Sequence, residues 1–128
     1  KNHSNMLQLL TRWIKDWESN DLDAYSSHYS KTGFISAAGR DYASWKGHKR
    51  WVNGKKTHVN VEFSNLNIYL YPGEPDLVLM QYDQIYRSNN FNNETGKQLY
   101  WQKQQDRWQI VYEGTRPLTI SGSSLASN

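Results

Sequence analysis

The sequence predicts an α+β domain, in which three N-terminal helices pack on one face of a curved, mostly antiparallel sheet. Apolar residues recur every three to four positions up to about residue 56, and at every second position from His58 onward. Helices therefore precede a run of strands, an order typical of α+β folds. The 128 residues suffice for one modest core, and we expect a single domain over residues 1–117. Residues 118–128 are small and polar and are expected to form a disordered tail.

The first two helices are predicted from spacing and from capping residues. Residues 5–19 form an amphipathic pattern with a stripe of large apolar side chains on one face. A second, short helix begins after a cap at Asn20 or Asp21 and is expected to run to about Tyr29. The stripe on the first helix consists of Met6, Leu10, Trp13 and Trp17.

A brief strand at residues 34–35 and a third helix are expected next. Asp41 is the predicted N-cap of this helix and Gly54 its predicted C-cap. The residues that recur at three- and four-residue steps, and so share one face, are Tyr42, Trp45, Lys49 and Val52.

Four strands joined as a meander are expected in the second half of the chain. The alternating pattern slips by one position at Ser64–Asn65, which predicts an inserted bulge and a bend in the first long strand. A bent sheet curls around its helices and leaves an open end, where small-molecule sites tend to form. The expected strands cover residues 58–71, 77–88, 97–104 and 107–115.

One face of the second long strand is unusually rich in polar groups. Its side chains alternate between faces, so Asp83 points away from the residues on either side of it. Such a face either lines a hydrated pocket or is an ordinary wet surface, and its apolar beginning at Val78 and Met80 favours the pocket. The residues that share this face are Tyr82, Gln84, Tyr86 and Ser88.

Four further residues complete the predicted ligand-binding pocket. Lys97 and Trp101 share a face of the next strand, and Lys97 is expected near Ser88 or Tyr86. There it either attracts an anionic ligand or is an ordinary solvated lysine. Glu113 closes the last strand, either as an ion-pair partner or as an acid/base group. Tyr29 is expected to flank the cavity from the second helix.

Composition excludes several classes of function. The chain has no cysteine, which rules out disulfides and a thiol nucleophile. The four histidines lack metal-ligand spacing, so neither a metal site nor a cofactor is expected. The net charge of +3 is concentrated in residues 46–56, either a solvated helix end or an anion-binding patch. These basic residues are not interleaved with aromatics, which argues against nucleic-acid binding. No apolar run is long enough to span a membrane.

Five stretches together carry a resemblance to a known family: WIKDWESNDLDAYSSHYS, DYASWKGHKR, QYDQIYRS, GKQLYWQ and DRWQIVYE. Their order resembles the cone-shaped, nuclear transport factor 2-like (SnoaL-like) superfamily. More narrowly, they are similar to the C-terminal accessory domain of bacterial L,D-transpeptidase family cell-shape proteins. In that family the accessory domain follows a catalytic domain with a Cys nucleophile. This chain begins with Lys and lacks cysteine, so we expect an excerpt or a processed product without the transpeptidase activity.

The resemblance implies a non-catalytic accessory domain that binds a small polar ligand or a peptidoglycan fragment in its pocket. The parent protein is expected to be a periplasmic or otherwise exported cell-wall protein. One alternative is a small-molecule isomerase or cyclase of the same fold, although no carboxylate falls clearly inside the predicted pocket. Another is a protein–protein interaction domain, such as a homodimer formed through the outer face of the sheet.

Overall fold

The computed structural model describes residues 2–118 and has one five-stranded sheet in the order β1-β5-β4-β3-β2. Strands β2 to β5 form an antiparallel meander, while the short β1 pairs parallel with β5. The predicted α+β fold with a mostly antiparallel sheet is confirmed. The strands are β1 (Ile35–Ser36), β2 (Val59–Tyr71), β3 (Glu74–Ser88), β4 (Asn92–Gln104) and β5 (Arg107–Arg116).

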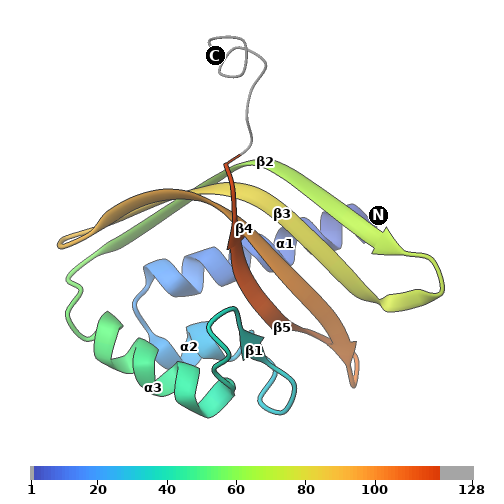
Figure 1. Ribbon diagram of the computed structural model, residues 1–128, viewed down its shortest axis with the longest axis horizontal. Helices are drawn as coiled ribbons and strands as arrows, with labels where there is room; N and C mark the ends of the chain where they lie inside the picture. Colours follow the sequence, from blue (N-terminus) through green and yellow to red (C-terminus); the bar gives the residue numbers. More distant parts are fainter. Residues whose placement is uncertain (1, 119–128) are drawn as a thin grey trace, which may run out of the picture.

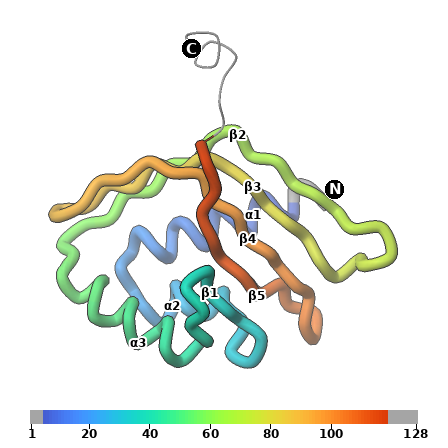
Figure 2. Tube along the Cα trace, in the orientation of Figure 1, coloured from blue at the N-terminus to red at the C-terminus, as the bar shows by residue number. Residues whose placement is uncertain are grey.

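The helices α1 (Asn2–Glu18), α2 (Leu22–Ser26) and α3 (Tyr42–Asn53) lie on the concave side of the curved sheet (Figure 1). The Asp21 carboxylate accepts hydrogen bonds from two backbone amides of α2, and that of Asp41 accepts one from Ser44. Gly54 caps the C-terminus of α3. These caps confirm the predicted positions. The trace places α3 below the β3–β4 hairpin, on the concave side of the sheet (Figure 2).

The predicted end of the second helix was wrong: α2 stops at Ser26 and does not reach Tyr29. The reason is competition from the sheet for the following backbone groups. The His28 carbonyl accepts a hydrogen bond from the Ile110 amide, and the Ser30 amide donates to the Ile110 carbonyl. Residues 28–30 therefore run beside β5, and Tyr29 is held under the sheet as part of this connection.

The bulge predicted in the first long strand is confirmed. The pairing register between β2 and β3 shifts between Ser64 and Asn67, and Asn65 has a positive φ of 56°. The side-chain amide nitrogen of Asn65 (Nδ2) donates a hydrogen bond to the Asp83 carboxylate at 2.7 Å, which holds the Asn65 side chain against β3. Because a bulge increases bending and twist, it helps the sheet to curve over α1.

The β3–β4 connection is shorter than predicted, which changes the position of Lys97. The loop contains only residues 89–91, closed by a hydrogen bond from the Ser88 amide to the Phe91 carbonyl. Strand β4 therefore begins at Asn92, five residues before the predicted start. Lys97 lies opposite Tyr82, so its predicted place beside Ser88 or Tyr86 was wrong.

The core between sheet and helices is largely aromatic. Trp13, Trp17, Trp45 and Ile110 are buried, whereas Trp108 is only partly buried and packs against the core. Within the described range 2–118, no helix is both long enough and apolar enough to cross a membrane. The predicted tail lies outside the described residues, apart from Leu118.

Candidate ligand-binding site

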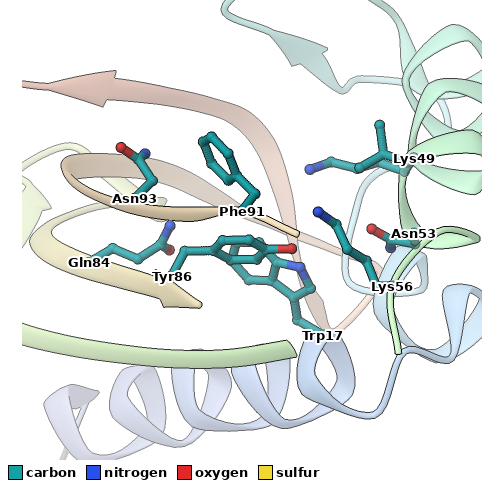
Figure 3. Close-up of a pocket in the computed structure, with 9 residues that line it drawn as sticks. Trp17, Lys49, Asn53, Lys56, Gln84, Tyr86, Phe91 and Asn93 are labelled. Carbon is teal, nitrogen blue, oxygen red and sulfur yellow. The ribbon is translucent and has the colours of Figure 1, made fainter. Parts of the chain in front are cut away.

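A cavity of about 200 Å³ opens between the C-terminal end of α1, the inner face of α3 and the β3–β4 hairpin (Figure 3). It lies at the end of the sheet where the cone is open. We call it the aromatic hollow. It is lined by Trp17, Lys49, Val52, Asn53, Lys56, Gln84, Tyr86, Phe91 and Asn93.

Aromatic rings form one wall of this hollow. The ring centroids of Trp17 and Tyr86 are 5.3 Å apart, and those of Tyr86 and Phe91 are 6.1 Å apart. Phe91 is 55% exposed and stands at the rim, whereas Trp17 is part of the core. The wall thus presents ring surfaces that can pack against the apolar parts of a ligand.

Two lysines form the opposite wall, and their amino groups point toward the rings (Figure 3). The Lys56 Nζ donates to the Ser88 Oγ at 3.2 Å and also to the Asn90 Oδ1. Lys49 reaches in from α3, with its Nζ 5.6 Å from the centroid of the Trp17 ring. None of the nine described residues that line the hollow is acidic, so the hollow carries a net positive charge.

Lys49 differs from the other lysine because its ammonium group has no protein acceptor. It makes neither a hydrogen bond nor an ion pair with any residue in the described part of the chain. Burial, which removes water from the ammonium, lowers the pKa of Lys49; the nearby Glu113 charge opposes this shift, whereas Lys97 and Lys56 add to it. An anionic ligand group would supply the missing counter-charge.

The wall formed by β3 contributes an unsatisfied acceptor. Gln84 is 4% exposed, and its Oε1 has no hydrogen-bond partner in the described structure. A buried amide oxygen without a partner costs about 1–3 kcal/mol. Because Gln84 lines the hollow, a ligand N–H or O–H group that donates to this oxygen would recover that energy.

A second hollow of about 240 Å³ lies on the other side of Lys49, which lines both cavities. Its floor contains an ion pair between the Lys97 Nζ and the Glu113 Oε2 at 2.7 Å, with each residue only 8% exposed. Burial acts to raise the pKa of Glu113, but Lys97, Lys49 and two hydrogen bonds outweigh it and hold the pKa below its usual value. Glu113 therefore stays ionised at neutral pH.

The second Glu113 oxygen is held by a buried network. The Tyr29 hydroxyl donates to Glu113 Oε1 at 2.7 Å and accepts from Trp13 Nε1 at 3.0 Å. The Tyr25 hydroxyl lies 3.1 Å from that of Tyr29, and since the single Tyr29 proton is given to the carboxylate, Tyr25 must be the donor between them. The Tyr29 hydroxyl thus holds one oxygen of the Glu113 carboxylate, and the Lys97 ammonium holds the other.

The structure divides the predicted pocket residues among three places. Gln84 and Tyr86 line the aromatic hollow, and Ser88 lies at its edge through Lys56. Lys97 and Glu113 line the second hollow, where Lys97 is paired and not solvated. The remaining three, Tyr82, Trp101 and Tyr29, are fully buried in the core.

The sequence interpretation missed most of the α3 wall. Lys49, Asn53 and Lys56 line the hollow, although only strand residues and Tyr29 had been predicted to do so. A signal was present, because Lys49 falls on the same helical stripe as the core residue Trp45. His28 contacts Asp16 at 2.6 Å, and no group of three or more metal-ligating side chains is found among the described residues.

Comparison with protein families places this geometry in a known group. Residues 5–114 match the family described as the Cds6 C-terminal NTF2-like domain. The chain belongs to this family. The match covers the whole lining of the aromatic hollow, the lining of the second hollow except Thr115, and all eight elements except the first residues of α1 and the end of β5. The predicted nuclear transport factor 2-like fold is confirmed. Among curated proteins, none matches the chain.

Solved structures show the same NTF2-like fold at low identity. Bd1075 of Bdellovibrio bacteriovorus aligns with a TM-score of 0.80 and 24% identity, over 92% of this chain and 41% of that one. The helical cell shape determining protein Pgp2 of Campylobacter jejuni, as its K307A mutant, aligns with a TM-score of 0.76 and 21% identity, over 84% and 38%. An NTF2-like protein of unknown function from Pseudomonas putida gives 0.75 and 15%, over 94% and 89%. The chain thus spans about two fifths of the first two relatives.

Proposed function

We propose that this domain is a non-catalytic binding module that takes up a small, polar, anionic ligand in the aromatic hollow. The ligand class that fits best is a fragment of peptidoglycan, either a stem peptide with free carboxylates or a glycan portion. The apolar faces of sugar rings or peptide side chains would pack on Tyr86 and Phe91. A carboxylate would sit between Lys49 and Lys56.

The observation that carries this proposal is the uncompensated charge of the hollow. Two lysine ammonium groups face a cavity with no acidic lining residue, and Lys49, which contacts the Trp17 and Tyr25 rings, has no hydrogen-bond or ion-pair partner within residues 2–118. Water alone is a poor substitute for a counter-charge in a partly buried site, because a charged group taken out of bulk water needs an opposite charge or several hydrogen bonds. The unpaired Gln84 oxygen adds a place for a donor on the same ligand.

Binding fits this site better than proton-transfer catalysis does. An isomerase or cyclase needs a base whose pKa lies near neutrality inside the cavity. Among the described residues that line the two hollows, Glu113 is the carboxylate, and its pKa is held below the ordinary value by Lys97 and Lys49 in spite of burial. Both of its oxygens are also occupied, one by Lys97 and one by Tyr29. It serves to fix the cavity wall.

The parent protein, on this proposal, is an exported cell-wall protein of the L,D-transpeptidase type. Support comes from the family match and from the fold shared with Pgp2, which is a cell shape determining protein. This domain would then hold wall material while another part of the protein acts on it.

Titration of the domain with purified muropeptides tests the proposal. We expect saturable quenching or a shift of tryptophan fluorescence, because Trp17 forms part of the hollow. Lys56→Gln should weaken binding about ten- to a hundredfold, since a hydrogen bond to a charged group contributes about 1.5–3 kcal/mol. Lys55→Gln is the matched control, because it removes the same charge from an exposed side chain stacked on Trp51 outside the hollow.

Two outcomes would overturn the proposal. One is the absence of any saturable response to muropeptides at millimolar concentration. The other is equal loss of affinity in the Lys55 and Lys56 variants, because this would mean that general positive charge and not the hollow attracts the ligand. Muropeptides with amidated carboxylates should bind weakly to the wild-type domain.

A further inference from the structure

The amino group of Lys49 lies where an amine can act as a nucleophile. It sits at the junction of the aromatic hollow and the second hollow, reachable from both. Its Nζ lies 5.6 Å from the Trp17 ring centroid and 6.0 Å from that of Tyr25, so ring faces replace much of its water. The proposed binding function uses only its charge and gives no role to this placement.

The other lysines of this region are all placed differently. Lys97 is ion-paired with Glu113, Lys56 donates to Ser88 and Asn90, and Lys46 lies 3.6 Å from Asp23. Lys55 is exposed and stacks on Trp51. In residues 2–118, Lys49 is thus the lysine of this region that combines a cavity position with the lack of any acceptor.

The charges around Lys49 act on its pKa in opposite directions: the Glu113 carboxylate favours the ammonium form, whereas Lys97 and Lys56 favour the neutral amine. Positive groups approach from two sides, Lys97 on β4 and Lys56 after α3, while the nearby carboxylate of Glu113 on β5 is already engaged by Lys97 and Tyr29. Desolvation and neighbouring cations are the two means by which proteins activate a lysine for attack on a carbonyl group. Burial is the largest of these effects and lowers the pKa of Lys49 in spite of the opposing Glu113 charge.

We propose that Lys49 forms a reversible imine with small aldehydes or ketones that carry an acidic group. The amine lone pair adds to the carbonyl carbon, and the resulting carbinolamine loses water to give a C=N bond to Nζ. One carbonyl is consumed and one water is released, so no oxidant or reductant is needed. Lys56 lies on the same cavity wall and would bind the acidic group of the ligand.

The size of the site limits the ligand. A cavity of about 200 Å³ admits a group of a few heavy atoms and not an extended cofactor. The simplest compound that combines an aldehyde with a carboxylate is glyoxylate, which is therefore the probe of choice. This inference rests on the same hollow as the proposed function but needs chemistry that ligand binding alone does not.

Reductive trapping tests the inference. The intact domain is incubated with glyoxylate and cyanoborohydride, which reduces an imine to a stable carboxymethyl-lysine, and the modified residue is located by peptide mass spectrometry. We expect one dominant adduct at Lys49. A lowered pKa raises the neutral fraction of a lysine at neutral pH, so labelling at Lys49 should exceed labelling at the exposed Lys55 severalfold.

Two variants make the result decisive. Lys49→Arg keeps the charge but has no primary amine, and it should lose the dominant adduct while its circular dichroism and melting temperature show that it is folded. Lys55→Arg should label like the wild-type domain. Adduct spread evenly over the lysines, or an unchanged yield in the Lys49 variant, would overturn the inference.

The result is separable from the fate of the proposed function. Muropeptide titration of the unmodified domain is an independent measurement. If muropeptides bind but glyoxylate labels Lys49 no faster than Lys55, the imine chemistry is refuted and the binding module stands. If Lys49 is selectively trapped but muropeptides give no response, the hollow is a carbonyl site and the wall ligand is wrong.

Discussion

The substitution Glu113→Gln is expected to destabilise the domain strongly, because it leaves the Lys97 ammonium buried without its counter-charge. The two groups are 2.7 Å apart and each residue is 8% exposed. Removing one partner of a buried ion pair costs about 3–5 kcal/mol. Since domains are stable by only about 5–15 kcal/mol, this is a large share of the total. For a chain of this size it corresponds to a fall in melting temperature of roughly 10–20 °C.

Urea unfolding, followed by tryptophan fluorescence, measures this loss. Glu62→Gln is the matched control, because the Arg87–Glu62 pair at 3.3 Å is exposed on both sides. Exposed pairs contribute about 0–1 kcal/mol. If Glu113→Gln and Glu62→Gln lower the free energy of unfolding by the same small amount, the buried pair does not hold the cavity wall as argued.

Three further predictions concern the same core. The pKa of Glu113 is lowered in the folded protein, so the ionised carboxylate stabilises the fold above the unfolded-state pKa of about 4.5, and this stabilisation is lost as pH falls through the folded-state pKa. The free energy of unfolding, measured as a function of acid pH, should therefore fall in the wild type and fall less in Glu113→Gln. Identical pH profiles would contradict this prediction. Tyr82→Phe should leave the stability unchanged or raise it, because the buried Tyr82 hydroxyl has no hydrogen-bond partner in the described structure. Tyr29→Phe should lower the free energy of unfolding by about 1–3 kcal/mol, because it removes the hydrogen bonds to Glu113 and Trp13. Equal melting temperatures of the two variants would refute the difference. Gly96→Ala should destabilise the domain, because the new Cβ would lie 2.4 Å from the Arg116 carbonyl oxygen. Gly47→Ala on α3 places its Cβ where nothing lies within 4 Å, and it should stabilise the domain by about 0.5–1 kcal/mol. A stabilising Gly96→Ala would show that the end of β5 does not approach β4 so closely.

Local patterns predicted much of the fold. Alternation placed Gln84 and Tyr86 on the inner face of β3, and a single phase slip revealed the bulge beside Asn65. Both features depend on neighbouring residues along the chain. The caps at Asp21 and Asp41 were readable for the same reason.

Features set by contacts between distant segments were not readable from these patterns. The end of α2 depends on hydrogen bonds from residues 28–30 to Ile110 on β5. The position of Lys97 depends on the length of the β3–β4 loop, and a polar run rich in asparagine gives no sign of where pairing resumes. Because the predicted start of β4 was several residues too late, Lys97 was expected at the mouth of the pocket, whereas it lies in a buried ion pair with Glu113.

The same limit explains why the α3 wall was missed. A lysine on a helical stripe is normally placed at the surface, since lysines are rarely buried without a partner. Lys49 enters the hollow because the aromatic side chains of α1 and α2 leave room beside them, which only the assembled core determines.

The central claim, that the hollow between α3 and the β3–β4 hairpin receives an anionic wall fragment, is tested most directly by NMR. Amide and indole resonances of the domain are followed during addition of a muropeptide with free carboxylates. We expect saturable shifts confined to the residues around Trp17, Lys49, Lys56 and Phe91. Shifts that are absent, or that gather on the outer face of the sheet around Tyr100, would contradict the claim.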